Sequence, residues 1–180
     1  GAAEMRVHAV CAFGDRLRFA LIKALPLDAM ALLVSFVEND EHGWDDLRFE
    51  SAITLCEAKH PGGRALLGSL SDPRRRFDAI KALGRVADDE DVKIVLRRIS
   101  GGWFVAWPDR LAASAVLSAV GDVEGGRYFE NRLSSNWQFA KRALAIHLLG
   151  DVRHPRAFEQ LSVLAQSGDR KERSVAIRAL

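Results

Sequence analysis

The sequence has little of what would identify a secreted protein, a membrane protein or a metal site. Its 180 residues include 2 cysteines, Cys11 and Cys56, each inside an apolar stretch. Two cysteines are too few for a disulfide framework or a cysteine-based metal site, so we expect buried free thiols and a reducing, cytoplasmic location. No apolar run approaches the roughly 18 residues of a membrane span, and the N-terminus lacks the order of a signal peptide.

The common motifs of catalytic and cofactor sites are also missing. The 5 histidines include no pair spaced by three or four residues, and none is followed by glutamate. No nucleophile motif is recognisable, and neither phosphate-binding pattern, GxGxxG or GxxxxGK[ST], occurs. We therefore expect no catalytic residue, metal, cofactor or small-molecule substrate. His60 and His154 each precede a proline, and a capping or turn role is sufficient for them.

Charge of one sign is not in excess. The formal net charge is +2, with 28% charged and 48% hydrophobic residues. This composition is ample for a hydrophobic core, and it neither demands nor excludes a nucleic-acid partner.

The chain does contain an internal repeat, most clearly in residues 72–99. Asp72 is expected to be a helix N-cap with Pro73 at the first helical position, and Gly84 ends that helix. An acidic turn, residues 88–91, then opens a second helix. Together the two helices form a hairpin.

The same spacing of apolar residues recurs ahead of five anchor positions. The anchors are Pro26, Glu57, Gly84, Gly121 and Gly150, which are 31, 27, 37 and 29 residues apart. A period near 31 residues with two helices per unit is typical of an α-solenoid. The longest interval carries an insertion rich in glycine and aromatics, residues 100–107.

We therefore expect one all-α domain over residues 1–180, an α-solenoid of about five and a half stacked hairpins. The units are expected at residues 15–43, 44–71, 72–106, 107–135, 136–168 and, as a partial unit, 169–180, after an extra N-terminal helix at 3–13. The last half unit ends on an apolar stripe, whereas terminal repeats usually present a polar face, so a longer parent protein is expected.

Residues 72–99, DPRRRFDAIKALGRVADDEDVKIVLRRI, resemble the short HEAT-like repeat of the type also found in phycobilin lyases. Residues 142–164, RALAIHLLGDVRHPRAFEQLSVL, resemble a second copy. The resemblance covers roughly residues 16–180. It implies that the second helices line a concave surface and that the protein binds partners, because few such arrays are enzymes. HEAT-like di-iron hydroxylases use His-Glu pairs, which this sequence lacks.

Basic residues recur near the first turn of the second helices. They are Arg64, Lys93, Arg127 and Arg156, followed one turn later by Arg97, Arg98 and Arg132. Stacked repeats would align them at roughly 10 Å intervals. Cations near helix N-termini cost some helix stability, so this basic ridge indicates binding of an acidic protein segment or a phosphate backbone. The alternative is a solvated face, neutralised by nearby Glu90, Asp91, Glu130 and Glu159.

Three tryptophans, Trp44, Trp107 and Trp137, stand 13 or 14 residues before an anchor, just ahead of a first helix. Each indole either packs against the preceding hairpin and so fixes the start of its helix, or belongs to an exposed aromatic edge with Trp103. The long connection, residues 101–109 (GGWFVAWPD), is the most site-like segment, because long loops often carry function.

Arginines also recur in the first helices, eight residues before an anchor. They are Arg6, Arg18, Arg76, Arg142 and Arg173, with Arg48 one residue out of register. The HEAT-like resemblance implies an Arg–Asp ladder between repeats, with Asp122 and Asp151 as candidate acids, and hence a structural role.

The leading hypothesis is a non-catalytic interaction scaffold whose basic ridge and Trp-rich edge bind a protein partner, such as one with an acidic segment. The expected binding residues are Arg64, Lys93, Arg97, Arg127, Arg156, Trp103, Trp107, Asp109 and Trp137. We expect neither a membrane nor, given the low net charge, a nucleic acid as partner. The first alternative is a nucleic-acid binder or a HEAT-like DNA glycosylase, in which Trp103, Trp107, Asp109 and Trp137 would be a loose analogue of the lesion site. The second, a phycobilin lyase or chaperone, rests on repeat type alone.

Overall fold

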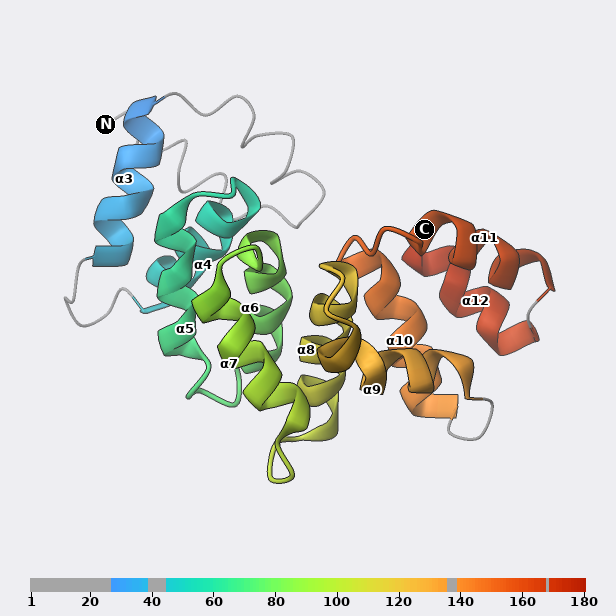
Figure 1. The fold of residues 1–180 in the computed structure, drawn as a ribbon. Coiled ribbons are helices and arrows are strands. Elements are labelled where there is room, and N and C mark those ends of the chain that lie inside the picture. The colour runs from blue at the N-terminus through green and yellow to red at the C-terminus, as the bar shows by residue number, and fades with distance from the viewer. Residues whose placement is uncertain (1–26, 39–44, 136–138, 168) are drawn as a thin grey trace. The chain divides into compact units, whose positions relative to one another are not determined.

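The computed structural model describes residues 27–38, 45–135, 139–167 and 169–180, and within these ranges the regular elements are all helices (Figure 1). The expected all-α class is therefore confirmed. No helix in these ranges is long and apolar enough to cross a bilayer. The extra helix expected at residues 3–13 lies outside the described residues, as do residues 15–26 of the first expected unit, Trp44 and Trp137.

The chain divides into two compact units, residues 1–86 and 87–180. The elements of the first unit are α3 (Leu27–Glu38), α4 (Asp45–Glu57), the 3-10 turn η1 (Pro61–Ala65), α5 (Leu66–Ser69), α6 (Arg76–Leu83) and η2 (Gly84–Val86). α4 packs against α3, η1, α5 and α6, so it is the central helix of this unit. The fully buried side chains include Leu33, Leu55, Leu66, Ile80 and Leu83.

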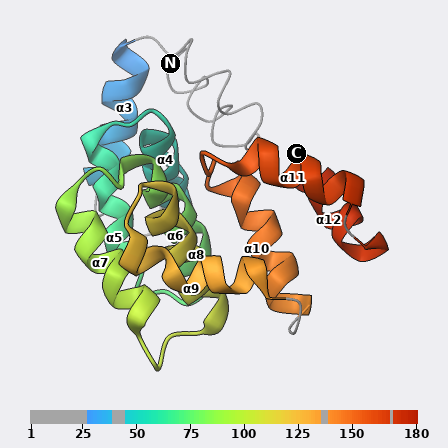
Figure 2. The same cartoon turned by 45° about the vertical axis from the view of Figure 1, so that its right-hand side comes forward.

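The elements of the second unit are α7 (Glu90–Gly101), α8 (Trp107–Ala119), α9 (Val123–Ser134), α10 (Phe139–Asp151), α11 (Ala157–Ser167) and α12 (Arg170–Ala179). Helix α10 packs against α8 and α12, so these three helices form a row, while α7 packs against both α8 and α9. Both views show α10 beside α9 and α12 (Figures 1 and 2). The core residues include Leu96, Leu111, Leu117, Phe129, Ile146 and Leu149.

Three connections between helices use the same turn. A residue with positive φ ends the first helix: Lys59 at 54°, Gly121 at 81° and Arg153 at 51°. The backbone N–H of the next residue bonds the carbonyl five residues earlier, from Leu55, Leu117 and Leu149, at 2.8–3.0 Å. This is a left-handed helix end, which satisfies carbonyl groups that the helix itself leaves unpaired.

The residue after each turn caps the next helix with its side chain. His60 accepts from the Gly62 N–H, Asp122 from the Gly125 N–H and His154 from the Arg156 N–H. Asp89 does the same for α7, accepting from the N–H groups of Asp91 and Val92. These caps are 29, 33 and 32 residues apart, a more even spacing than that of the sequence anchors. The histidine capping roles expected from the sequence are confirmed.

The glycine anchors therefore do not occupy one structural position. Gly121 is a left-handed helix end, and Gly84 has right-handed helical backbone at the end of α6. Gly150 lies inside α10, where a Cβ atom would collide with the backbone oxygen of Ala179 in α12. Its requirement for glycine comes from the close approach of two helices and not from helix termination.

The start of the third hairpin also differs from the expectation. Helix α6 begins at Arg76, so Pro73 lies in the turn that precedes the helix and not at its first position. The Asp72 side chain accepts from the Arg74 N–H at 2.9 Å, and its carbonyl accepts from the Arg76 N–H at 2.9 Å. Asp72 thus organises the turn that leads into the helix.

Two of the predicted first-helix arginines, Arg76 and Arg142, contact partners other than the expected aspartates, and Arg6 and Arg18 lie outside the described residues. Arg76 Nε donates to the Leu70 carbonyl at 2.6 Å. Arg142 pairs with Glu172 at 2.7 Å. The expected partner Asp122 instead binds Arg97, which belongs to a second helix.

Candidate functional site

A groove with a volume of about 550 Å³ lies between α7 and α9 in the second unit. Its lining residues are Arg97, Ser100, Gly101, Glu124, Gly125, Arg127, Tyr128 and Asn131. The sequence predicted both helices as second helices of hairpins, the position at which it also predicted the basic ridge. The groove therefore lies where a partner segment was expected.

The floor of the groove is fixed by the approach of α9 to α8. A Cβ atom on Gly126 would lie 2.8 Å from Ser118 Cα, so only glycine fits at this crossing. The Gly125 carbonyl accepts hydrogen bonds from two hydroxyl groups, those of Ser114 at 2.7 Å and Ser100 at 3.0 Å. These bonds join α9 to both α8 and α7, so the groove walls are held in place.

Tyr128 lies beside two arginines at the same surface. The guanidinium carbons of Arg110 and Arg132 lie 4.9 Å and 5.1 Å from the centre of its ring, within range of a cation–π interaction. The buried Nε of Arg132 has no hydrogen-bond partner among the described residues. Tyr128 is therefore a preorganised part of the groove.

Several predicted ridge cations are engaged with acids. Arg97 binds Asp122 at 2.6 Å and Glu90 at 3.1 Å, and Lys93 lies 3.8 Å from Glu90. The bond from the Gly125 N–H is the main cause of a lowered pKa of Asp122; burial opposes it, and the Arg97 guanidinium lowers the pKa further. Glu90 is exposed, so its pairs with Lys93 and Arg97 contribute little stability and leave these two cations able to exchange this partner.

Arg127 differs from these residues, because within the described ranges it is exposed and has neither an ion pair nor a hydrogen bond from its side chain. Arg156 pairs with Glu130, and Arg64 is exposed in η1 of the first unit. Counted from the cap of each turn, Arg64 and Lys93 are at position four, Arg127 at five and Arg156 at two. The four cations therefore do not repeat one helical position.

The aromatic residues divide into two classes. The side chain of Trp103 is 91% exposed and that of Phe104 is completely exposed. Trp107 is 38% exposed at the start of α8, with Lys141 Nζ 5.8 Å from its ring centre. Asp109 is buried in the first turn of α8.

A polar cluster that the sequence did not predict joins three parts of the second unit. Its members are Ser118 of α8, Glu130 of α9, and His154 and Arg156 of the α10–α11 turn. Ser118 Oγ donates to Glu130 and lies 3.1 Å from His154 Nε2, while Arg156 donates to Glu130. No spacing in the sequence connects these residues, because they come from separate helices.

This serine, histidine and glutamate do not form a hydrolytic triad. His154 Nδ1 accepts the Arg156 N–H at 3.2 Å, so the neutral imidazole carries its proton on Nε2. A protonated Nε2 donates to Ser118 Oγ and cannot remove the hydroxyl proton. Burial and then the nearby Arg156 lower the pKa of His154, which keeps it neutral. The cluster is a structural bridge.

The sequence matches no protein-family model, and no curated protein sequence matches it. Function must therefore be argued from the groove and the exposed residues themselves.

Proposed function

We propose that this chain is a non-catalytic interaction scaffold of stacked HEAT-like hairpins that binds an acidic segment of a protein partner along its second helices. Two observations support a solenoid arrangement within the second unit. Helices α8, α10 and α12 pack in a row, and α7 contacts α9. The even spacing of the caps in this unit, Asp89, Asp122 and His154, at 33 and 32 residues, is also typical of a repeat array.

The proposal rests mainly on the groove between α7 and α9. Arg127 offers a guanidinium with no ion pair among the described residues, and Asn131 offers an exposed amide beside it. A guanidinium binds a carboxylate through two parallel hydrogen bonds, and an amide can bond a peptide backbone. Together they fit an extended segment with an aspartate or glutamate.

Lys93 and Arg97 extend this basic surface along α7. Their present acids, Glu90 and Asp122, come from this chain. A partner carboxylate could replace the exposed Glu90 at little cost, because exposed ion pairs contribute little stability. The Asp122 side chain is largely buried, so its pair with Arg97 would be retained. The expected result is a moderate affinity that weakens with added salt.

Peptide selection tests this function and needs no identified partner. Displayed random peptides are selected on the whole protein, and the affinity of the enriched sequences is measured by calorimetry. We expect enrichment of aspartate and glutamate, and about tenfold weaker binding to Arg127→Glu, equivalent to about 1.4 kcal/mol.

The matched control is Arg170→Glu, the same charge reversal at an exposed position of α12. It should bind the enriched peptides as tightly as the wild type. Equal binding by wild type and Arg127→Glu, or enrichment without acidic residues, would contradict the proposal.

The nucleic-acid and lyase alternatives stay predictions. Asp109 is buried in the first turn of α8, which gives the glycosylase analogy no support.

A further inference from the structure

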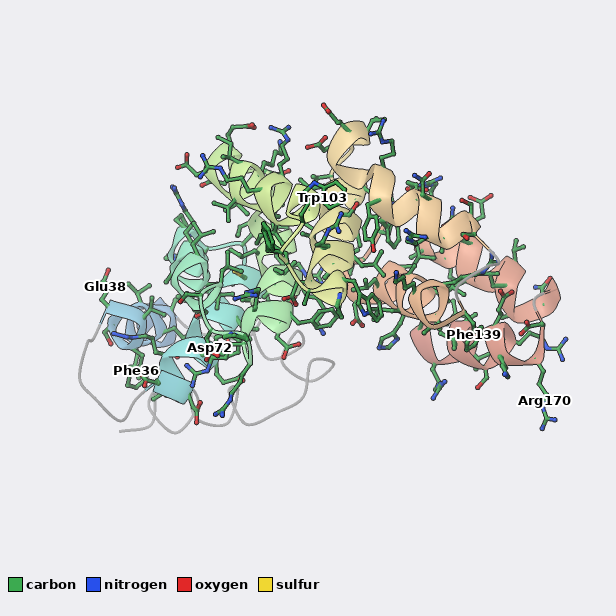
Figure 3. The ribbon with its side chains drawn as sticks, turned by 90° about the horizontal axis from the view of Figure 1, so that it is seen from below. Phe36, Glu38, Asp72, Trp103, Phe139 and Arg170 are labelled. Atoms are coloured by element: carbon green, nitrogen blue, oxygen red, sulfur yellow. The ribbon has the colours of Figure 1, made fainter. Side chains whose placement is uncertain are left out.

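The connection between α7 and α8 carries two large aromatic side chains on a tight turn. Gly102 and Val105 are the first and last residues of this turn, joined by a hydrogen bond of 3.4 Å from the Val105 N–H to the Gly102 carbonyl. Trp103 and Phe104 are its two central residues, with exposed fractions of 91% and 105%. Figure 1 shows the turn projecting past the ends of both helices, and Trp103 is labelled in Figure 3.

Packing and a hydrogen bond fix the backbone of this turn. A Cβ atom on Gly102 would lie 2.7 Å from the Val105 side chain and 3.1 Å from the Arg98 carbonyl, so only glycine fits there. The Gly102 N–H also bonds the Ile99 carbonyl at the end of α7. These contacts fix the base of the turn against the helix and direct its two central residues outward.

Turn formation does not explain the choice of tryptophan and phenylalanine. The central positions of tight turns favour glycine, proline, asparagine and aspartate, which supply the required backbone angles. Two adjacent aromatic rings in water make an apolar surface that folding has not buried. The side chains therefore indicate a contact outside the chain.

The sequence that leads into the turn is basic, and no acid occurs from ten residues before the turn to three residues after it. Residues 92–108 include Lys93, Arg97 and Arg98 and lack both aspartate and glutamate. Arg98 is exposed, about one turn before the end of α7, and within the described ranges its side chain forms no ion pair. An anionic surface can approach the turn from this side without repulsion from a neighbouring carboxylate in this stretch.

We infer that Trp103 and Phe104 insert into the interfacial region of an anionic lipid membrane, with Arg98 beside the headgroups. Residues 101–106 offer one side-chain hydrogen-bonding group, the indole N–H of Trp103. A protein interface would normally surround such anchors with a polar rim, whereas the bilayer interface itself supplies polar groups to an amphipathic indole.

This peripheral contact goes beyond the proposed scaffold and differs from the sequence-based expectation of no membrane partner. That expectation rested on the lack of a spanning segment, whereas the peripheral contact is supported by the exposure of two side chains. One short turn inserts little apolar surface, so binding should be reversible and should depend on anionic lipid.

The test is co-sedimentation of the whole protein with vesicles of phosphatidylcholine alone or with about a third phosphatidylserine. We expect binding to the anionic vesicles, weakened by salt. The double variant Trp103→Ser/Phe104→Ser should reduce the partition coefficient by at least about tenfold, and Arg98→Gln by roughly fivefold. The control Phe158→Ser removes another exposed phenylalanine, on α11, and should bind as the wild type does.

A spectroscopic measurement locates the contact independently. Vesicles should shift the tryptophan emission of the wild type to shorter wavelength, and Trp103→Phe should bind the vesicles but lose most of that shift. Thermal unfolding of each variant should match the wild type, because the altered side chains are exposed.

No binding of the wild type to anionic vesicles, or equal binding by the double variant, would overturn the inference. Loss of peptide binding in the double variant without any vesicle binding would also overturn it, by assigning the turn to a protein contact. Failure of the scaffold proposal is distinguishable, because Arg127→Glu should affect peptides and leave vesicle binding unchanged.

Discussion

Ser118 and His154 are 36 residues apart in the sequence and 3.1 Å apart in the structure, measured from Oγ to Nε2. The bond connects α8 to the turn between α10 and α11, and the bond from Ser118 to Glu130 extends it to α9. His154 also caps that turn through its other nitrogen. One buried imidazole therefore joins neighbouring hairpins, and its protonation state affects both bonds.

Stability should fall below neutral pH because of His154. Its pKa is lower in the folded protein than the usual value near 6.5, with burial as the main cause and Arg156 as the second. The unfolded chain therefore binds a proton first, so the contribution of His154 is complete above about pH 6.5 and is lost as pH falls through the folded pKa. Urea unfolding at several pH values measures this effect.

The variant His154→Asn separates the cap from the titration. Asparagine is a good capping residue but has no proton to gain in this range, so we expect a smaller loss of unfolding free energy on acidification. The matched variant His147→Asn removes a half-exposed imidazole on α10, outside the cluster. An identical pH dependence in wild type and His154→Asn would exclude this role.

Asp122 should stabilise the second unit mainly as a helix cap. Its side chain accepts from the Gly125 N–H at 3.0 Å and also binds Arg97. Asp122→Ala should lower the free energy of unfolding by about 1–2 kcal/mol, and Asp122→Asn by less, because asparagine retains the capping bond. Chemical denaturation measures both changes. Asp88→Ala alters an exposed aspartate near the start of α7 and should be close to neutral; a loss as large as that of Asp122→Ala would contradict this account.

Gly150→Ala should destabilise the protein, because the added methyl group would collide with the Ala179 backbone oxygen. We expect a loss of about 1–3 kcal/mol, as for other cases of overpacking. Gly68→Ala in α5 meets no atom within 4 Å and should be neutral or stabilising by up to about 1 kcal/mol. Thermal and urea unfolding compare the two variants, and equal stability would show that α10 and α12 do not approach as described.

Cys56 should be chemically inert in the folded protein. Its side chain is fully buried, its thiol donates to the Gly63 carbonyl at 3.3 Å, and burial raises its pKa to about 12. In a Cys11→Ser background, a thiol reagent at pH 8 should react with no group until urea is added, and then with one thiol per chain. Rapid reaction of the native protein would contradict the burial of Cys56.

The helices of the fold were largely predictable because apolar spacing determines which segments can pack. The unit expected at residues 107–135 contains the two helices α8, Trp107–Ala119, and α9, Val123–Ser134. The register between units was less accurate, since the prediction treated every anchor glycine alike. Gly121 ends a helix, whereas Gly150 permits a helix crossing, and only the three-dimensional packing distinguishes these two causes.

The candidate site was predictable in part. The recurrence of cations correctly indicated Arg127 in a second helix, but it could not show that Arg97 is engaged with Asp122 while Arg127 is not. Nothing in the sequence distinguishes the exposed Trp103 from the partly covered Trp107. Such differences depend on residues distant in the chain, such as Lys141, which periodicity does not relate to them.

Chemical-shift mapping with an enriched acidic peptide tests the central claim, partner binding in the α7–α9 groove, most directly. We predict that titration of the isotopically labelled protein perturbs backbone amides mainly within residues 97–101 and 124–131, which include the groove lining. The same titration of Arg127→Glu should give much smaller shifts at equal peptide concentration. Perturbations confined to other helices, or unchanged shifts in the variant, would contradict binding in this groove.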